Sequence, residues 1–174
     1  MQLTRFTFCG RFDHALDDKG RIMLPSPFRE ELRVSVNPDR LYVGCYPGTG
    51  HLSLYPVERW MELVEAWKDE KRFQSTTLML EAQRMFFANI EPVALDRVGR
   101  ILIPAIFREK ASLVREASVL GVADKLEIWS PDRLREQEQK AADLWQQALD
   151  LERARPLTHG GTEGYGDAPR LPQW

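Results

Sequence analysis

One short pattern in the sequence could do chemistry, and it occurs twice. Asp-x-x-Gly-Arg stands at residues 17–21 and again at residues 96–100. An aspartate side chain can close a turn by accepting hydrogen bonds from the backbone that follows it, and glycine supplies the positive φ that a tight turn needs. An arginine directly after such a turn leaves the backbone at a defined point. Its planar fork of donors matches carboxylates, phosphates and the O6 and N7 edge of guanine.

The two patterns belong to a longer internal repeat. Residues 16–30 align without gaps on residues 95–109, and nine of the 15 aligned residues are identical. Unrelated segments share about one identity over this length at average residue frequencies. The chain is therefore an internal duplication. We expect one repeat at 5–80, a second at 81–153, and a disordered tail at 154–174, where glycine and proline are frequent and apolar residues are few.

The elements around each turn must hold it in place. Residues 5–9 alternate between apolar and polar and predict a strand that leads into the first turn, with a less regular counterpart at 93–95. Apolar residues at 22–24 and 101–103 predict a strand that leaves each turn. A proline comes next in both copies, where it suits the start of a helix because its missing N–H is not needed there. Each half thus predicts a strand, a turn, a strand and a short helix.

The remainder of each repeat predicts a second hairpin and longer helices. Hairpins are indicated where apolar strands flank turn residues, and helices where apolar residues recur every three or four positions. The predicted hairpins lie at 41–55 and 118–129, and the predicted helices at 26–32, 56–73, 75–88, 105–114 and 131–153. This order of strands and helices indicates an α+β fold.

The charge balance limits how the chain could bind nucleic acid. Its 174 residues include 24 Lys and Arg against 26 Asp and Glu, which gives a net charge of −2. Affinity for a nucleic-acid backbone comes from basic side chains that displace counterions. A DNA-binding role therefore needs local basic clusters, or many weak sites joined by oligomerisation. Residues 97–115 form one such cluster, with five basic side chains against one acidic side chain.

Other classes of function lack their motifs in this sequence. Cys9 and Cys45 lie 36 residues apart without zinc-site spacing, so we expect two reduced, buried thiols. The glycine turn at 48–50 lacks the lysine of a phosphate-binding loop. The longest apolar run, 101–107, is far shorter than the ~18 residues of a membrane span. We expect no cofactor, no metal, no enzymatic activity and no membrane segment, and a cytoplasmic location.

The doubled motif resembles a known family. Leu-Asp-x-x-Gly-Arg-Ile-x-x-Pro-x-x-Phe-Arg-Glu, present twice at this spacing, is similar to the MraZ family, within the wider AbrB-like group of swapped-hairpin regulators. Residues 86–88 before the second copy, and 119–122 and 127–129 after it, fit the same resemblance. The likeness covers residues 6–134.

The resemblance implies both a fold and a role. The fold would be an internally duplicated swapped-hairpin β-barrel of the α+β class, with the two repeats interleaved and flanked by helices. The role would be that of a DNA-binding transcriptional regulator acting on direct repeats in double-stranded DNA, upstream of its own division and cell-wall gene cluster. Members assemble into ring-shaped homo-oligomers, so we expect self-association. Because they bind DNA, we also expect a nucleoid-associated location. An AbrB-like protein-interaction module of the antitoxin type, with residues 156–174 wrapped on a partner, is the alternative.

The same resemblance assigns roles to residues of the two turns. It implies that Arg21 and Arg100 bind DNA. Lys19 and Arg97 lie inside the turns, and from this position we expect them to bind DNA through its phosphates, with plain solvation as the alternative. The residues expected to support the motif are Asp17, Gly20, Asp96 and Gly99. The aspartates are given a supporting role because a carboxylate that faced a phosphate would be repelled. Each arginine could instead serve only as a stabilising ion pair with the aspartate of its own turn, and Arg29 and Arg108 are interpreted as structural helix residues.

Overall fold

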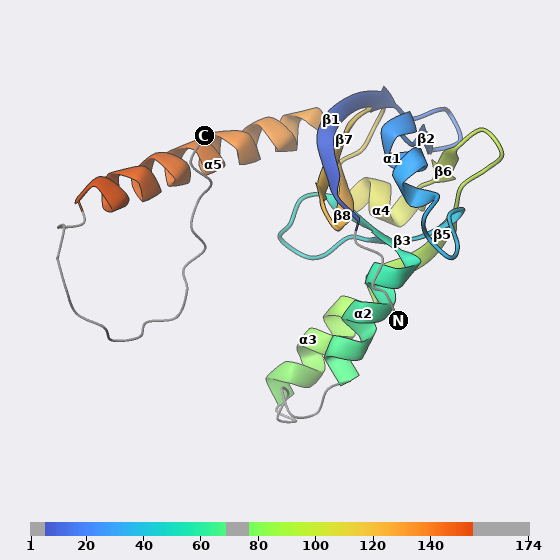
Figure 1. Cartoon of the computed structure of the whole chain (residues 1–174), viewed down its shortest axis with the longest axis horizontal. Coiled ribbons are helices and arrows are strands. Elements are labelled where there is room, and N and C mark those ends of the chain that lie inside the picture. Colours follow the sequence, from blue (N-terminus) through green and yellow to red (C-terminus); the bar gives the residue numbers. More distant parts are fainter. Residues whose placement is uncertain (1–5, 69–76, 155–174) are drawn as a thin grey trace. The chain divides into compact units, whose positions relative to one another are not determined.

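The computed structural model describes residues 6–68 and 77–154 of the chain (Figure 1). By their contacts the residues fall into a first unit, Met1–Glu138, and a second, Gln139–Trp174. All strands and both copies of the repeated motif belong to the first unit. The expected disordered tail, apart from its first residue, and the expected helical residues 69–73 and 75–76 lie outside the described residues.

The described residues form eight strands and five helices. The strands are β1 (Phe8–Ala15), β2 (Arg21–Met23), β3 (Arg40–Gly44), β4 (Leu52–Pro56), β5 (Ile90–Ala94), β6 (Arg100–Leu102), β7 (Glu116–Ala123) and β8 (Lys125–Trp129). The helices are α1 (Ser26–Leu32), α2 (Val57–Lys68), α3 (Thr77–Phe87), α4 (Ala105–Lys110) and α5 (Pro131–Ala154). The predicted α+β class is confirmed, and every predicted helix and hairpin has a counterpart.

Three elements differ in extent from the sequence-based expectation. The strand expected at 93–95 corresponds to β5, which spans Ile90–Ala94. The first strand is expected at 5–9, but β1 begins at Phe8 and continues to Ala15 because its backbone pairs with β7 over eight residues. The second half of β1 is hard to recognise as a strand from the sequence, because it carries few apolar residues. Its Arg11 and Asp13 side chains are exposed and form an ion pair with each other. The helix predicted at 105–114 ends at Lys110, shortly before Ser112 takes a positive φ of 54°.

The strands form a six-stranded antiparallel sheet in the order β1-β7-β8-β4-β3-β5, and a separate two-stranded ribbon of β2 and β6. The halves exchange strands, because β1 of the first half pairs with β7 of the second, and β5 of the second pairs with β3 of the first. The ribbon also joins the halves, with one strand from each (Figure 1). Among the described strands no closed barrel is found.

Equivalent residues of the two halves fill the core. Ile22 lies opposite Ile101 in the ribbon, and both side chains are fully buried. Apolar side chains behind the ribbon come in matching pairs, Leu24 with Ile103 and Phe28 with Phe107. Burying an apolar side chain of this size is worth about 1.5–3 kcal/mol, so the core strongly favours the inward direction at these positions.

The turns are tied to the opposite half at their glycines. The backbone N–H of Leu24 donates to the carbonyl oxygen of Gly99, and that of Ile103 donates to Gly20, at 2.9 and 3.0 Å. Arg29 of α1 packs over Gly99, and a Cβ added to that glycine would lie 2.5 Å from the Cδ atom of Arg29. An equivalent arginine of α4 covers Gly20. Each turn therefore needs glycine for its positive φ and also for this close contact.

The contact gives a testable prediction for Gly99→Ala, with Gly48→Ala as the matched control. Both glycines have positive φ, 87° and 81°, but a Cβ at Gly48 meets no atom within 4 Å. The control should lose about 1–2 kcal/mol from backbone strain alone. Gly99→Ala should lose about 1–3 kcal/mol more, because Arg29 must move and give up its hydrogen bond to the Leu24 carbonyl.

Urea unfolding followed by tryptophan fluorescence measures both losses. When it is introduced into an Arg29→Ala background, Gly99→Ala should cost no more than Gly48→Ala, since the two substitutions act on one contact. Equal losses at Gly99 and Gly48 would contradict the role given to Arg29.

Candidate nucleic-acid interface

The first turn is closed by the side chain of Asp17. Its Oδ1 atom accepts hydrogen bonds from the backbone N–H groups of Lys19 and Arg21, both at 3.0 Å. Its Oδ2 atom accepts the Nε–H of Arg21 at 2.7 Å and lies 2.7 Å from Nη2 of the same guanidinium. The backbone N–H of Gly20 donates to the Asp17 carbonyl at 2.8 Å, with Gly20 at a φ of 77°. One carboxylate thus fixes both the loop and the arginine that follows it.

The second turn repeats this arrangement atom by atom. Oδ1 of Asp96 accepts the backbone N–H groups of Val98 at 3.0 Å and Arg100 at 2.9 Å. Oδ2 accepts the Nε–H of Arg100 at 2.8 Å, and Gly99 donates to the Asp96 carbonyl at 2.9 Å. The duplication read from the sequence therefore extends to the side-chain hydrogen bonds that shape each turn.

Both carboxylates are held in their ionised form. Hydrogen bonds from the side chain and backbone of Arg21 lower the pKa of Asp17 from 3.8 to about 2. The backbone N–H of Arg100, followed by its side chain, lowers the pKa of Asp96 in the same way. At both positions, stabilisation of the charged form by hydrogen-bond donors outweighs the opposing effect of desolvation.

The structure shows the ion pair that was the structural alternative for each arginine, yet the pair is not buried. The side chains of Arg21 and Arg100 remain 30% and 32% exposed, and those of Asp17 and Asp96 are exposed to a similar degree. The ion pair and an outward contact are therefore compatible. In each pair the aspartate restrains the guanidinium while leaving part of it at the surface.

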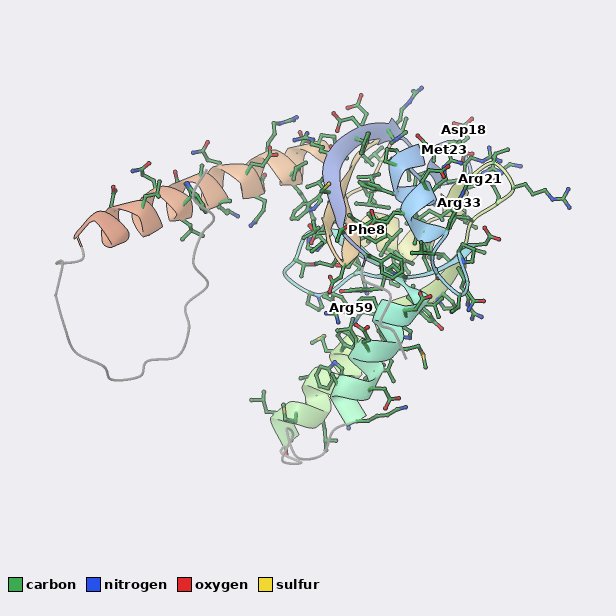
Figure 2. All side chains as sticks on the ribbon, in the orientation of Figure 1. Phe8, Asp18, Arg21, Met23, Arg33 and Arg59 are labelled. Atoms are coloured by element: carbon green, nitrogen blue, oxygen red, sulfur yellow. The ribbon has the colours of Figure 1, made fainter. Side chains whose placement is uncertain are left out.

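The ribbon brings the two turns together on one exposed face. Arg21 lies opposite Leu102, and Met23 lies opposite Arg100, while the residues between them point into the core. The turns are close enough for Nη1 of Arg100 to lie 3.8 Å from Oδ2 of Asp17. Figure 2 shows Arg21 and Met23 at the end of the first unit where β2 and β6 lie. Arg21 and Arg100, which are 79 positions apart in the sequence, thus lie on the same face of the ribbon.

The tips of the two turns differ in charge. The first tip carries Asp18 and Lys19, which are both exposed, and the second carries Arg97 and Val98. Val98 is 54% exposed, although it is apolar. The predicted contact residues Lys19 and Arg97 therefore both reach solvent, but they occupy different positions within their turns.

Several residues of this site were not identified from the sequence. Met23 and Leu102 were interpreted as members of apolar strands, yet they share the outward face with the arginines. The signal was their position two residues after Arg21 and Arg100, on the same side of a strand. Arg29 and Arg108 are structural, as expected, and donate from Nε to the carbonyl oxygens of Leu24 and Ile103. Their contacts with the turn of the opposite half could not be predicted, because no pattern of neighbouring residues in the sequence indicates them.

Within residues 6–68 and 77–154, no group of three or more His, Cys, Asp or Glu side chains is placed to hold a metal ion. Of the two thiols expected to be buried, Cys45 is buried but Cys9 is exposed. No helix in the same part of the chain has the length and apolar character to cross a membrane.

Fold and site together define an internally duplicated α+β protein that carries one Asp–Arg turn in each half and presents both turns on one ribbon. Residues 7–82 and 86–153 match the family described as "MraZ protein, putative antitoxin-like". The chain belongs to the MraZ family.

Individual relatives agree with this assignment. A protein named transcriptional regulator MraZ from Thermomicrobium roseum is 42% identical over 125 residues, which cover 72% of this chain and 82% of that protein. Proteins of the same name from Lactiplantibacillus plantarum and Heliobacterium modesticaldum are 35% and 32% identical. The alignments cover 83% and 82% of this chain, and 99% and 94% of those proteins.

The lowered pKa of Asp17 predicts how acid affects the first turn. Because the pKa is lower in the folded chain, the ionised carboxylate stabilises the fold above pH 3.8, and this contribution is lost as the pH falls toward 2. Asp17→Asn keeps an oxygen that can accept the backbone hydrogen bonds but removes the charge. The difference in unfolding free energy between the wild type and Asp17→Asn should be largest near neutral pH and should shrink below pH 4.

Urea unfolding at a series of pH values measures this difference, and Asp18→Asn, at the exposed neighbouring position, is the control. A difference for Asp17→Asn that stays constant from pH 7 to the acid limit would show that its charge does not stabilise the turn.

Proposed function

We propose that this chain is a sequence-specific DNA-binding transcriptional regulator, and that the outward face of the β2–β6 ribbon contacts double-stranded DNA. The observation that carries the proposal is the presence of two arginines, each fixed by an aspartate, on one exposed face. A two-stranded ribbon can enter the major groove of B-DNA. The names of its relatives, transcriptional regulator MraZ, support the same role.

The geometry of each ion pair leaves the arginine able to read a base. Asp17 occupies the edge of the Arg21 guanidinium formed by Nε and Nη2. The end of the guanidinium, with one N–H from each Nη atom, is the edge that pairs with O6 and N7 of guanine. Because the aspartate already restrains the side chain, less conformational entropy is lost when DNA binds. Asp96 restrains Arg100 through the same edge, although Nη1 of Arg100 also lies 3.8 Å from Oδ2 of Asp17.

The turn tips supply contacts to the DNA backbone. Lys19 and Arg97 are exposed at the two tips and would neutralise phosphates without reading sequence. The negative charges of Asp17 and Asp96 are offset by their own arginines, which reduces their repulsion of phosphate. The sites are thus divided into base contact by Arg21 and Arg100, phosphate contact at the tips, and positioning by the aspartates and glycines.

The net charge of −2 makes weak binding the expectation for a single copy of the chain. We propose that a ring-shaped homo-oligomer binds direct repeats upstream of its own division and cell-wall gene cluster. Linked sites raise affinity by ~10²–10⁴ when their geometry matches. The proposal includes a nucleoid-associated location in the cytoplasm and a role exercised by binding alone, without catalysis or a cofactor.

The architecture of the proposal is a swapped-hairpin barrel built from repeats at 5–80 and 81–153. Its support is the exchange of strands, in which β1 pairs with β7 and β5 pairs with β3. The ribbon of β2 and β6 lies on the approximate twofold axis that this exchange implies, with one strand from each repeat.

Removing the arginines tests the proposed function. Arg21→Ala and Arg100→Ala should each weaken sequence-specific binding by about 1–3 kcal/mol for each guanine contact that is lost. Fluorescence anisotropy over a salt series, on a duplex from upstream of the chain's own coding sequence, measures the change. Arg84→Ala is the control, because Arg84 lies on α3, pairs with Glu81 and is 70% exposed. A double variant with an intact circular dichroism spectrum and unchanged affinity would refute the assignment.

A further inference from the structure

The outward face of the ribbon carries two apolar side chains that do not belong to the core. Leu102 is 55% exposed and Met23 is half-buried, although both lie on short strands whose central residues are fully buried. The core behind the ribbon is filled by Ile22 and Ile101 and, two positions after them, by Leu24 and Ile103. A leucine that is this exposed at the end of β6 contributes little to folding, and an exposed apolar side chain on such a face can serve to contact a partner outside the chain.

The register places each of these apolar side chains beside an arginine. Leu102 lies opposite Arg21, and Met23 lies opposite Arg100, so the outward face carries two pairs, each made of one cation and one apolar group. Side chains that lie opposite each other in an antiparallel pair have Cβ atoms about 4.5–5.5 Å apart. Neighbouring base pairs in B-DNA are separated by about 3.4 Å. An arginine and its apolar partner can thus reach the same base pair or adjacent ones.

We propose that Met23 and Leu102 read the C5-methyl groups of thymines in the major groove, next to the guanines contacted by Arg100 and Arg21. This inference rests on the proposed function. Thymine is the base that presents a methyl group in this groove, and apolar side chains are the groups that recognise it. The flanking arginines favour a DNA duplex as the occupant of this face, because they can donate to the guanine edges that lie beside thymine methyl groups in the major groove. Each half therefore contributes an arginine to one pair and an apolar side chain to the other.

Deoxyuridine provides a direct test, because it differs from thymidine in the missing methyl group. The probe is a duplex selected from a random pool by the wild-type protein, with each thymine in turn replaced by deoxyuridine. Replacement of a contacted thymine should weaken wild-type binding about fourfold, which corresponds to one buried methyl group. Leu102→Ala should bind the thymine and deoxyuridine duplexes equally at one position, and Met23→Ala at another.

Leu80→Ala is the matched control, since this leucine of α3 is 47% exposed and lies outside the ribbon. It should keep the full response to deoxyuridine. The inference is overturned if no thymine replacement affects the wild type, or if Leu102→Ala and Met23→Ala keep the wild-type response. In those cases a loss of affinity in Arg21→Ala would leave the proposed function standing. Failure of the pool to yield any preferred sequence would overturn both.

Discussion

The site depends on a reciprocal contact in which each turn is completed by the other half of the chain. Gly99 accepts the backbone N–H of Leu24, and Gly20 accepts that of Ile103. An arginine from the opposite half then covers each glycine. A backbone hydrogen bond contributes about 0.5–1.5 kcal/mol net, so no single bond here is decisive. Together, however, these hydrogen bonds and arginine contacts mean that each turn keeps all of its contacts only when both halves are folded together.

This constraint also determines which side chains reach the surface. A slip of one residue in the β2–β6 register would turn Ile22 and Ile101 outward and bury the arginines, which the apolar core opposes strongly. The glycine carbonyl contacts hold the same register from the ends of the ribbon. Core packing thus determines which face of the ribbon carries the Arg21 and Arg100 side chains, and the aspartates fix the guanidinium groups on that face.

Local chemistry explains which features the sequence could predict. The Asp-x-x-Gly-Arg turns, the prolines before α1 and α4, and the helices depend on residues close in sequence, so their patterns indicated them correctly. The exchange of β1 and β5 between the halves, and the arginines that cover the opposite glycines, join residues far apart and leave no periodic trace. The exposure of Met23 and Leu102 could not be predicted, because the sequence of a short apolar strand does not show whether one or both of its faces are buried.

The unlike turn tips have a consequence for orientation. Two identical chains related by a twofold axis present identical ends, and such a ribbon has no preferred polarity along a duplex. Here the halves are covalently joined and have diverged, with Asp18 and Lys19 at one tip and Arg97 and Val98 at the other. The ribbon consequently has a head and a tail.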